Sequence, residues 1–177
     1  MRWAWVCLLW VVACGGSEVG APGFGEPLDP VPLLDPFALT PVKAEADPFV
    51  DHRPAEFDCP AATWGPEGGG FEVQTGACNY AAFDQPLPMP VEVGDRLSIL
   101  VWHDLLDSAE PGTAHLAVWV GTTVLWQAEV DIPAPSGTFE AVVPIASTPA
   151  ADARLGLHLH NHGFNSWRFV EVDLQRD

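Results

Sequence analysis

The stretch AHLAVWVGTTVLWQAEVD, residues 114–131, places two apolar, β-branched and aromatic runs on either side of the turn Val120-Gly121-Thr122-Thr123. Successive side chains of a strand point to opposite faces, so Leu116, Val118 and Val120 would share one face. Glycine adopts a positive φ without steric cost, which suits Gly121 to a two-residue hairpin turn. The stretch therefore predicts an antiparallel hairpin with strands over 114–120 and 123–131.

Similar short runs recur from residue 57 to residue 177, separated by turn residues such as Pro133, Pro135 and Gly137. No window keeps a period of 3.6 residues, so the pattern does not predict helices. Without helices to cover a parallel sheet, the runs predict an all-β fold, an antiparallel β-sandwich, with a closed barrel as the alternative. The expected strands span residues 70–75, 91–103, 114–120, 123–131, 138–145, 153–161 and 166–174.

The chain is strongly acidic. Its 177 residues include 7 Lys and Arg against 24 Asp and Glu, a formal net charge of −17 at pH 7. Binding to phosphates requires clustered bases, so this composition argues against nucleic acid as a partner and against docking on anionic lipid headgroups. Apolar residues make up 48% of the chain, which is enough to build the core of one domain.

An apolar run from Trp3 to Ala13 follows a single base, Arg2. The run has the length of a signal-peptide core, whereas a spanning helix needs about 20 residues. It ends in Val11-Val12-Ala13-Cys14, which resembles the lipobox of bacterial lipoproteins. That resemblance implies a signal peptide over residues 1–13 and a mature chain whose Cys14 carries diacylglycerol on its thiol and a fatty acid such as palmitate on its amino group. An ordinary secretory signal is the alternative.

The same resemblance implies a location. An Asp after the lipidated Cys often marks retention in the inner membrane, and here Gly15 stands in that place. We therefore expect an envelope protein held in the outer membrane by the lipid on Cys14. Two or three acyl chains give stable anchoring, whereas one chain holds a membrane only marginally.

Two cysteines remain for the folded part of the chain. Cys7 leaves with the signal peptide and Cys14 carries lipid, so outside the reducing cytosol Cys59 and Cys78 are expected to form a disulfide. A loop of this length stabilises a fold by about 3 kcal/mol, mainly by constraining the unfolded chain.

Residues 14–56 are rich in Pro and acidic side chains. Dense prolines interrupt helices and strands, so a disordered, extended tether is expected here, followed by the sandwich domain over residues 57–177. Within the tether, Asp35-Pro36-Phe37 recurs as Asp47-Pro48-Phe49. The apolar side chains of these repeats dock on the domain or on a partner, or they belong to a spacer and have no contacts of their own.

The sandwich region also resembles a known group of domains. Val93-Gly94-Asp95-Arg96-Leu97, the hairpin through Gly121 and the last run, Trp167 to Leu174, resemble the jelly rolls of carbohydrate-binding modules and galactose-binding-like proteins. Those domains commonly have a Gly-Asp entry to an early strand and an acidic, aliphatic last strand. The resemblance implies a jelly-roll sandwich, a carbohydrate ligand, and a structural calcium ion for which no ligands can be assigned in this sequence.

The period of two sorts side chains onto faces. Leu155, Leu157 and Leu159 are expected in the core, and the outer face is expected to carry His158, His160 and His162. In the last strand, Val170, Val172 and Leu174 are expected to point inward. The other face would carry Trp167, Phe169 and Glu171, while Trp102 and His103 cannot be assigned. An indole stacks on a pyranose, and imidazole and amide groups bond its hydroxyls. The candidate ligand-binding residues are His158, His160, Asn161, His162, Asn165 and Trp167.

Exposed His and Trp have another explanation. They also form cross-strand pairs, or lie beneath an ordered tether, and Asn-His-Gly is ordinary turn chemistry. A structural or protein-interaction lipoprotein without a small-molecule ligand is therefore the alternative function.

A metal site is a further alternative. His158 and His160 lie on one side of a strand about 7 Å apart, close enough to share a divalent ion, and His115 or His103 would be a third ligand. A carboxylate would come from Asp104 or Glu171. Apart from such an ion or the calcium, no cofactor is expected.

We expect a protein that is not an enzyme. The sequence has no Gly-x-Ser-x-Gly, His-Glu-x-x-His or phosphate-binding loop motif. Asp104 and Asp107 flank a short loop, where two carboxylates are more typical of turn caps than of a glycosidase pair.

Overall fold

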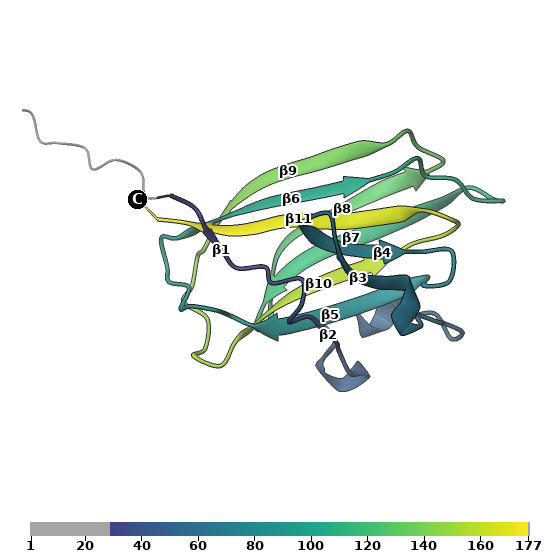
Figure 1. Ribbon diagram of the computed structural model, residues 1–177. Helices are drawn as coiled ribbons and strands as arrows, with labels where there is room; N and C mark the ends of the chain where they lie inside the picture. The colour runs from purple at the N-terminus through teal and green to yellow at the C-terminus, as the bar shows by residue number, and fades with distance from the viewer. Residues whose placement is uncertain (1–28, 177) are drawn as a thin grey trace, which may run out of the picture.

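Two antiparallel sheets pack face to face in the computed structural model, which describes residues 29–176 (Figure 1). Sheet A has the order β3-β4-β11-β6-β9, with β1 also pairing with β11, and sheet B has the order β2-β5-β10-β7-β8. The predicted antiparallel β-sandwich is confirmed. The eight main strands are β4 (Gly70–Gln74), β5 (Tyr80–Pro86), β6 (Arg96–His103), β7 (Gly112–Val120), β8 (Thr123–Ile132), β9 (Gly137–Pro144), β10 (Arg154–His160) and β11 (Ser166–Gln175).

The chain crosses repeatedly between the sheets. β4, β6, β9 and β11 belong to sheet A, while β5, β7, β8 and β10 belong to sheet B, which is the eight-strand arrangement of a jelly roll. The elements outside this set are short. They are the strands β1 (Val31–Pro32), β2 (Thr40–Pro41) and β3 (Trp64–Glu67), and the 3-10 helices η1 (Ala44–Ala46), η2 (Val50–His52) and η3 (Ala61–Thr63).

The β7–β8 hairpin forms as the sequence predicts. Val120 pairs with Thr123, and Gly121 between them has a φ of +60°. All seven predicted strands are present, with bounds shifted by a few residues. The sequence pattern missed β5, which lies inside sheet B, because Ala81, Ala82 and Pro86 are poor strand formers.

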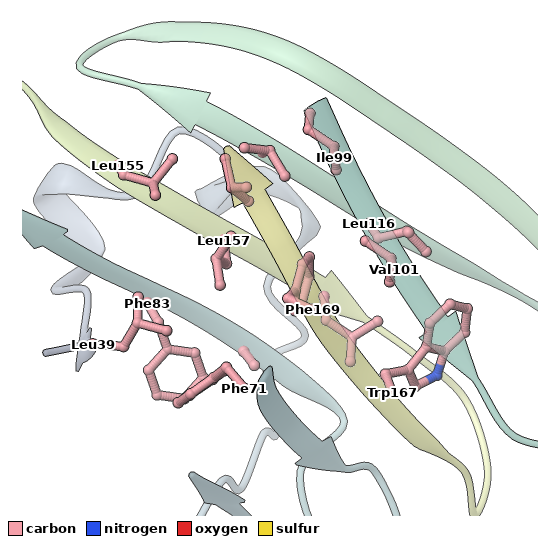
Figure 2. Packing of buried hydrophobic residues seen from close by; sticks show 14 of the residues in the cluster. Leu39, Phe71, Phe83, Ile99, Val101, Leu116, Leu155, Leu157, Trp167 and Phe169 are labelled. Atoms are coloured by element: carbon pink, nitrogen blue, oxygen red, sulfur yellow. The ribbon is translucent and has the colours of Figure 1, made fainter. Parts of the chain in front are cut away.

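The core lies between the two sheets (Figure 2). Leu155, Leu157 and Leu159 point into it from β10, as predicted, and Phe71 and Phe83 meet there at a centroid distance of 4.9 Å. Burying one such side chain contributes about 1.5–3 kcal/mol, so these residues account for much of the stability of the sandwich.

The predicted faces of β11 are wrong for its first half. Trp167 and Phe169 are buried in the core, and Val172 and Leu174 are buried there too. The register shifts between Phe169 and Glu171, which is a bulge. One extra residue reverses the alternation, so both halves of the strand direct apolar side chains inward.

Residues 31–56 pack against the sandwich, although their composition predicted a free tether as far as residue 56. Leu33 is fully buried and Leu39 nearly so, and the side-chain amide of Gln85 donates to Leu33 O at 2.7 Å. Proline is tolerated in edge strands because no partner needs its missing N–H. Pro32 and Pro41 lie in such short outer strands, so high proline content did not prevent pairing.

The predicted disulfide between Cys59 and Cys78 is confirmed. The signal peptide and the lipidation residue Cys14 lie outside the described residues. Among residues 29–176, no helix is long and apolar enough to cross a membrane.

Candidate functional site

The outer face of sheet B is covered by the chain itself. Residues 42–57, which we name the cover segment, lie over β5, β7 and β10. Val42 and Phe49 of this segment are buried against Ala82, Ala117 and Trp119. A side chain at Gly156 would overlap the Trp119 indole, which shows that the indole lies across β10.

Asp47 attaches the cover segment to the sheet. The Tyr80 hydroxyl donates to the Asp47 carboxylate and also lies 3.0 Å from Phe49 O, while Arg53 Nη2 lies 3.1 Å from Asp47 Oδ2. Burial, together with the Asp47 carboxylate, raises the pKa of Tyr80 above its ordinary value. The phenol therefore stays protonated and donates to Asp47 over the whole physiological range.

Three imidazoles meet beneath the cover segment. His115 comes from β7, His158 from β10 and His52 from η2, and their ligand nitrogens lie within 4.8 Å of one another. In the sheet, His158 pairs with Ala82 and Ala117, whose small side chains leave room above the strand. The Phe49 ring fills it and stacks on His158 at a centroid distance of 4.4 Å.

The environment keeps His158 neutral. Neither of its ring nitrogens has a hydrogen-bond partner among residues 29–176, and its side chain is fully buried. Burial, followed by the neighbouring His115, His52 and His160, lowers the pKa of His158 to about 2. Burial and His52 also lower the pKa of His115.

The other predicted metal candidates lie elsewhere. His160 is half-buried and contacts Tyr80 and His162, with its ring 4.9 Å from that of His162. His103 lies in the interior, where Nδ1 donates to Asp104 O at 2.8 Å and the ring packs on Trp167. The structure thus brings His115 and His158 together with His52, which sequence reasoning missed because His52 lies in the proline-rich segment.

The remaining candidate residues form hydrogen bonds in and around the loop between β10 and β11, residues 161–165. Trp167 Nε1 donates to Asn161 Oδ1 at 3.3 Å, and Asn161 Nδ2 donates to Thr75 Oγ1 at 2.8 Å. Asn165 Oδ1 accepts from Asp107 N at 2.7 Å. All three candidates are buried, so the expectation that Trp167 lies on an outer face is wrong. His162 alone of the six predicted ligand-binding residues is classed as exposed.

The outer face of sheet A is different, because it carries a solvent-accessible tryptophan. Trp102 points outward from β6 and is half-buried, within a cross-strand row of Glu72, Arg168, Trp102 and Thr138. The Arg168 guanidinium lies 5.6 Å from the Trp102 ring and 2.8 Å from Glu72 Oε2. Desolvation raises the Glu72 pKa, but hydrogen bonds from Ser166 and Arg168 outweigh it and hold that pKa below its ordinary value.

A hollow of about 490 Å³ lies on the same face. It is bordered by Leu100 and Val142 and by the carboxylates of Glu140 and Glu171, with Ser98 one step further along β6. Leu100 pairs with both Glu140 and Glu171, so an apolar floor lies between two acceptors. The sequence left this face unassigned because Leu100 and Trp102 made both sides of β6 apolar.

Comparisons with known proteins return similar folds. No protein-family model and no curated protein sequence matches the chain. Among solved structures, a family 16 carbohydrate-binding module is 14% identical, with 63% of this chain and 84% of that chain covered and a TM-score of 0.41. A family 61 module solved with β-1,4-galactotriose is 10% identical, with 79% and 83% covered and a TM-score of 0.39.

A third similar structure is the C-terminal family 6 module of a marine laminarinase from Zobellia galactanivorans. It is 19% identical, with 64% of this chain and 86% of that chain covered and a TM-score of 0.36. These likenesses concern the β-sandwich alone, and what each module binds is a property of that module.

Proposed function

We propose that this chain is a lipid-anchored envelope protein whose β-sandwich binds carbohydrate without catalysing a reaction. The observation that supports this function best is the outer face of sheet A, where Trp102 lies beside a hollow bordered by Glu140 and Glu171. This face replaces the predicted His, Asn and Trp residues of β10, the following loop and β11 as the proposed ligand surface.

The chemistry of the face suits a sugar chain. The Trp102 indole offers an apolar plane to a pyranose ring, and the carboxylates of Glu140 and Glu171 accept hydrogen bonds from hydroxyl groups. Trp102 and Ser98 lie four residues apart on β6, which is about 13 Å along a strand. The face therefore has the length for an oligosaccharide, and its carboxylates disfavour acidic glycans.

A glycan array tests the proposal. The full-length protein, purified in a detergent without a sugar headgroup, is applied to neutral and acidic glycans. We expect retention by a neutral oligosaccharide, lost in the Trp102→Ala variant and kept in the Phe37→Ala variant, which removes a ring exposed elsewhere. No retention by any glycan would overturn carbohydrate binding in favour of the protein-interaction alternative. Retention that survives Trp102→Ala would overturn the assignment of the ligand surface to this face.

The anchor is the second half of the proposal. It is supported by the lipobox-like run ending at Cys14, and the outer membrane is the proposed location. Replacing Cys14 with Ser should move the protein from the outer-membrane fraction to the soluble fraction. An unchanged distribution between the two fractions would contradict lipid anchoring.

A further inference from the structure

We propose that His52, His115 and His158 bind one divalent transition-metal ion of the zinc class, which fastens the cover segment to sheet B. The site lies on the opposite side of the sandwich from Trp102 and does not depend on carbohydrate binding. It differs from the site predicted from the sequence, because His52 takes the place expected for His160.

The spacing of the three imidazoles fits a shared ion. The ring centroids lie 4.7 Å apart for His52 and His115, 5.1 Å for His115 and His158, and 5.8 Å for His52 and His158. A tetrahedral zinc ion with Zn–N bonds of about 2.0–2.1 Å holds nitrogens about 3.3 Å apart. The nitrogens already lie within 4.8 Å of one another, and the exposed His52 side chain has room to move toward the other two rings.

His158 places an unused nitrogen donor in the cluster, because neither of its ring nitrogens has a hydrogen-bond partner among residues 29–176. Buried polar atoms are nearly always paired, so two unpartnered nitrogens on one fully buried ring call for an explanation. A bound ion supplies the missing partner for one of them.

His115 offers a second unused donor. Its Nδ1 is buried and has no hydrogen-bond partner among residues 29–176, and its ring lies 5.1 Å from that of His158 between ring centroids. An ion bound between the two rings would supply a partner for this nitrogen as well.

His52 gives the ion a mechanical role. It is the ligand that belongs to the cover segment, whereas His115 and His158 belong to the sheet. An ion bound by all three joins the two, and three protein ligands leave a fourth position for water. Packing of the rings against Phe49 without an ion is the competing explanation, and the experiment distinguishes the two.

The test is a zinc titration of the full-length protein, prepared without a histidine tag and treated with a chelator. Competition with a chromophoric chelator should give one zinc per chain, and cobalt in its place should give the visible spectrum of a tetrahedral site. His52→Ala should weaken zinc binding at least tenfold. His162→Ala, which removes an exposed histidine outside the cluster, should leave it unchanged.

Proteolysis provides a second measurement. Zinc should slow cleavage within residues 42–57 of the original protein but not of the His52→Ala variant, which retains Phe49 and Asp47 and so remains able to fold. Absence of stoichiometric zinc binding would overturn the proposal. Equal losses of affinity in the His52 and His162 variants would overturn it as well, because the ligand set would then be wrong.

Discussion

The two Asp-Pro-Phe repeats form the same turn but end in opposite environments. Phe37 N donates to Asp35 Oδ1 at 3.0 Å, and Phe49 N donates to Asp47 Oδ1 at 2.9 Å. The Phe37 side chain is nevertheless 84% exposed, whereas that of Phe49 is 7% exposed.

The exposure of the two Phe rings differs because the two turns contact different surfaces of the sandwich. The second carboxylate oxygen of Asp47 accepts from Tyr80 and Arg53, and Phe49 enters a space above Ala82 and Ala117. Asp35 is tied instead through its backbone N–H, which donates to Gln85 Oε1 at 2.9 Å. Local sequence thus determines the turn, while the surface below it determines whether the ring is buried.

Truncating the two rings is the strongest test of this contrast. Phe49→Ala should lower the free energy of unfolding by about 3–5 kcal/mol, because it empties a packed site. Phe37→Ala should change it by less than about 0.5 kcal/mol, as for other surface positions. Urea denaturation measures both values, and similar losses in the two variants would show that the repeats are equivalent.

Removing the Tyr80 hydroxyl tests the side-chain contact that holds the second repeat, through Asp47, to sheet B. Tyr80→Phe should cost about 1–3 kcal/mol, because Asp47 then lacks one donor in a buried site. The same denaturation experiment measures this loss. The double variant with Phe49→Ala should lose less stability than the sum of the two single losses, since both residues hold the same segment. A loss equal to that sum would show that the two contacts act independently.

Alkaline titration measures the same contact spectroscopically. The chain has a single tyrosine, so tyrosinate absorbance reports Tyr80 alone. Its pKa in the folded state is raised from 10.0, so its contribution to stability is complete below pH 10 and is lost as the pH rises further. Ionisation of the folded protein near pH 10, as in the urea-unfolded chain, would contradict the contact with Asp47.

Replacing the aspartates of the two repeats should separate them by a smaller difference than truncating the rings. Asp35→Ala removes the acceptor of one exposed turn hydrogen bond, and we expect a loss of about 0.5–1 kcal/mol. Asp47→Ala should cost clearly more, because it leaves Tyr80 and Arg53 without their shared acceptor. The comparison fails if thermal denaturation ranks the two variants in the reverse order.

The sandwich was largely predictable because alternation is a local signal. Leu155, Leu157 and Leu159 reveal their face by spacing alone, and Gly121 marks its hairpin. The bulge before Glu171 was not predictable, because one extra residue leaves no mark in composition and depends on pairing with β6. Trp167 was therefore assigned to the wrong side of its strand.

The candidate site was predictable only in part. Spacing placed His158 on the outer face of β10 correctly, but nothing near it in sequence indicates that Phe49 covers it. His52 joins His115 and His158 through tertiary contacts between distant segments, which no periodicity encodes. Trp102 stayed unassigned because Leu100 and Trp102 make the outer face of β6 apolar in part, like its inner face, so alternation gives no sign of which face is buried.

The pairing of Val31 with Leu174 has a consequence for attachment. The chain enters the sandwich at β1 beside the end of β11, so its two ends leave from one rim of the molecule (Figure 1). The segment that precedes residue 29 and a reporter protein fused after residue 177 are therefore attached at the same rim. The opposite rim, with the exposed Phe164 in the loop before β11, would stay unobstructed for antibodies or labels.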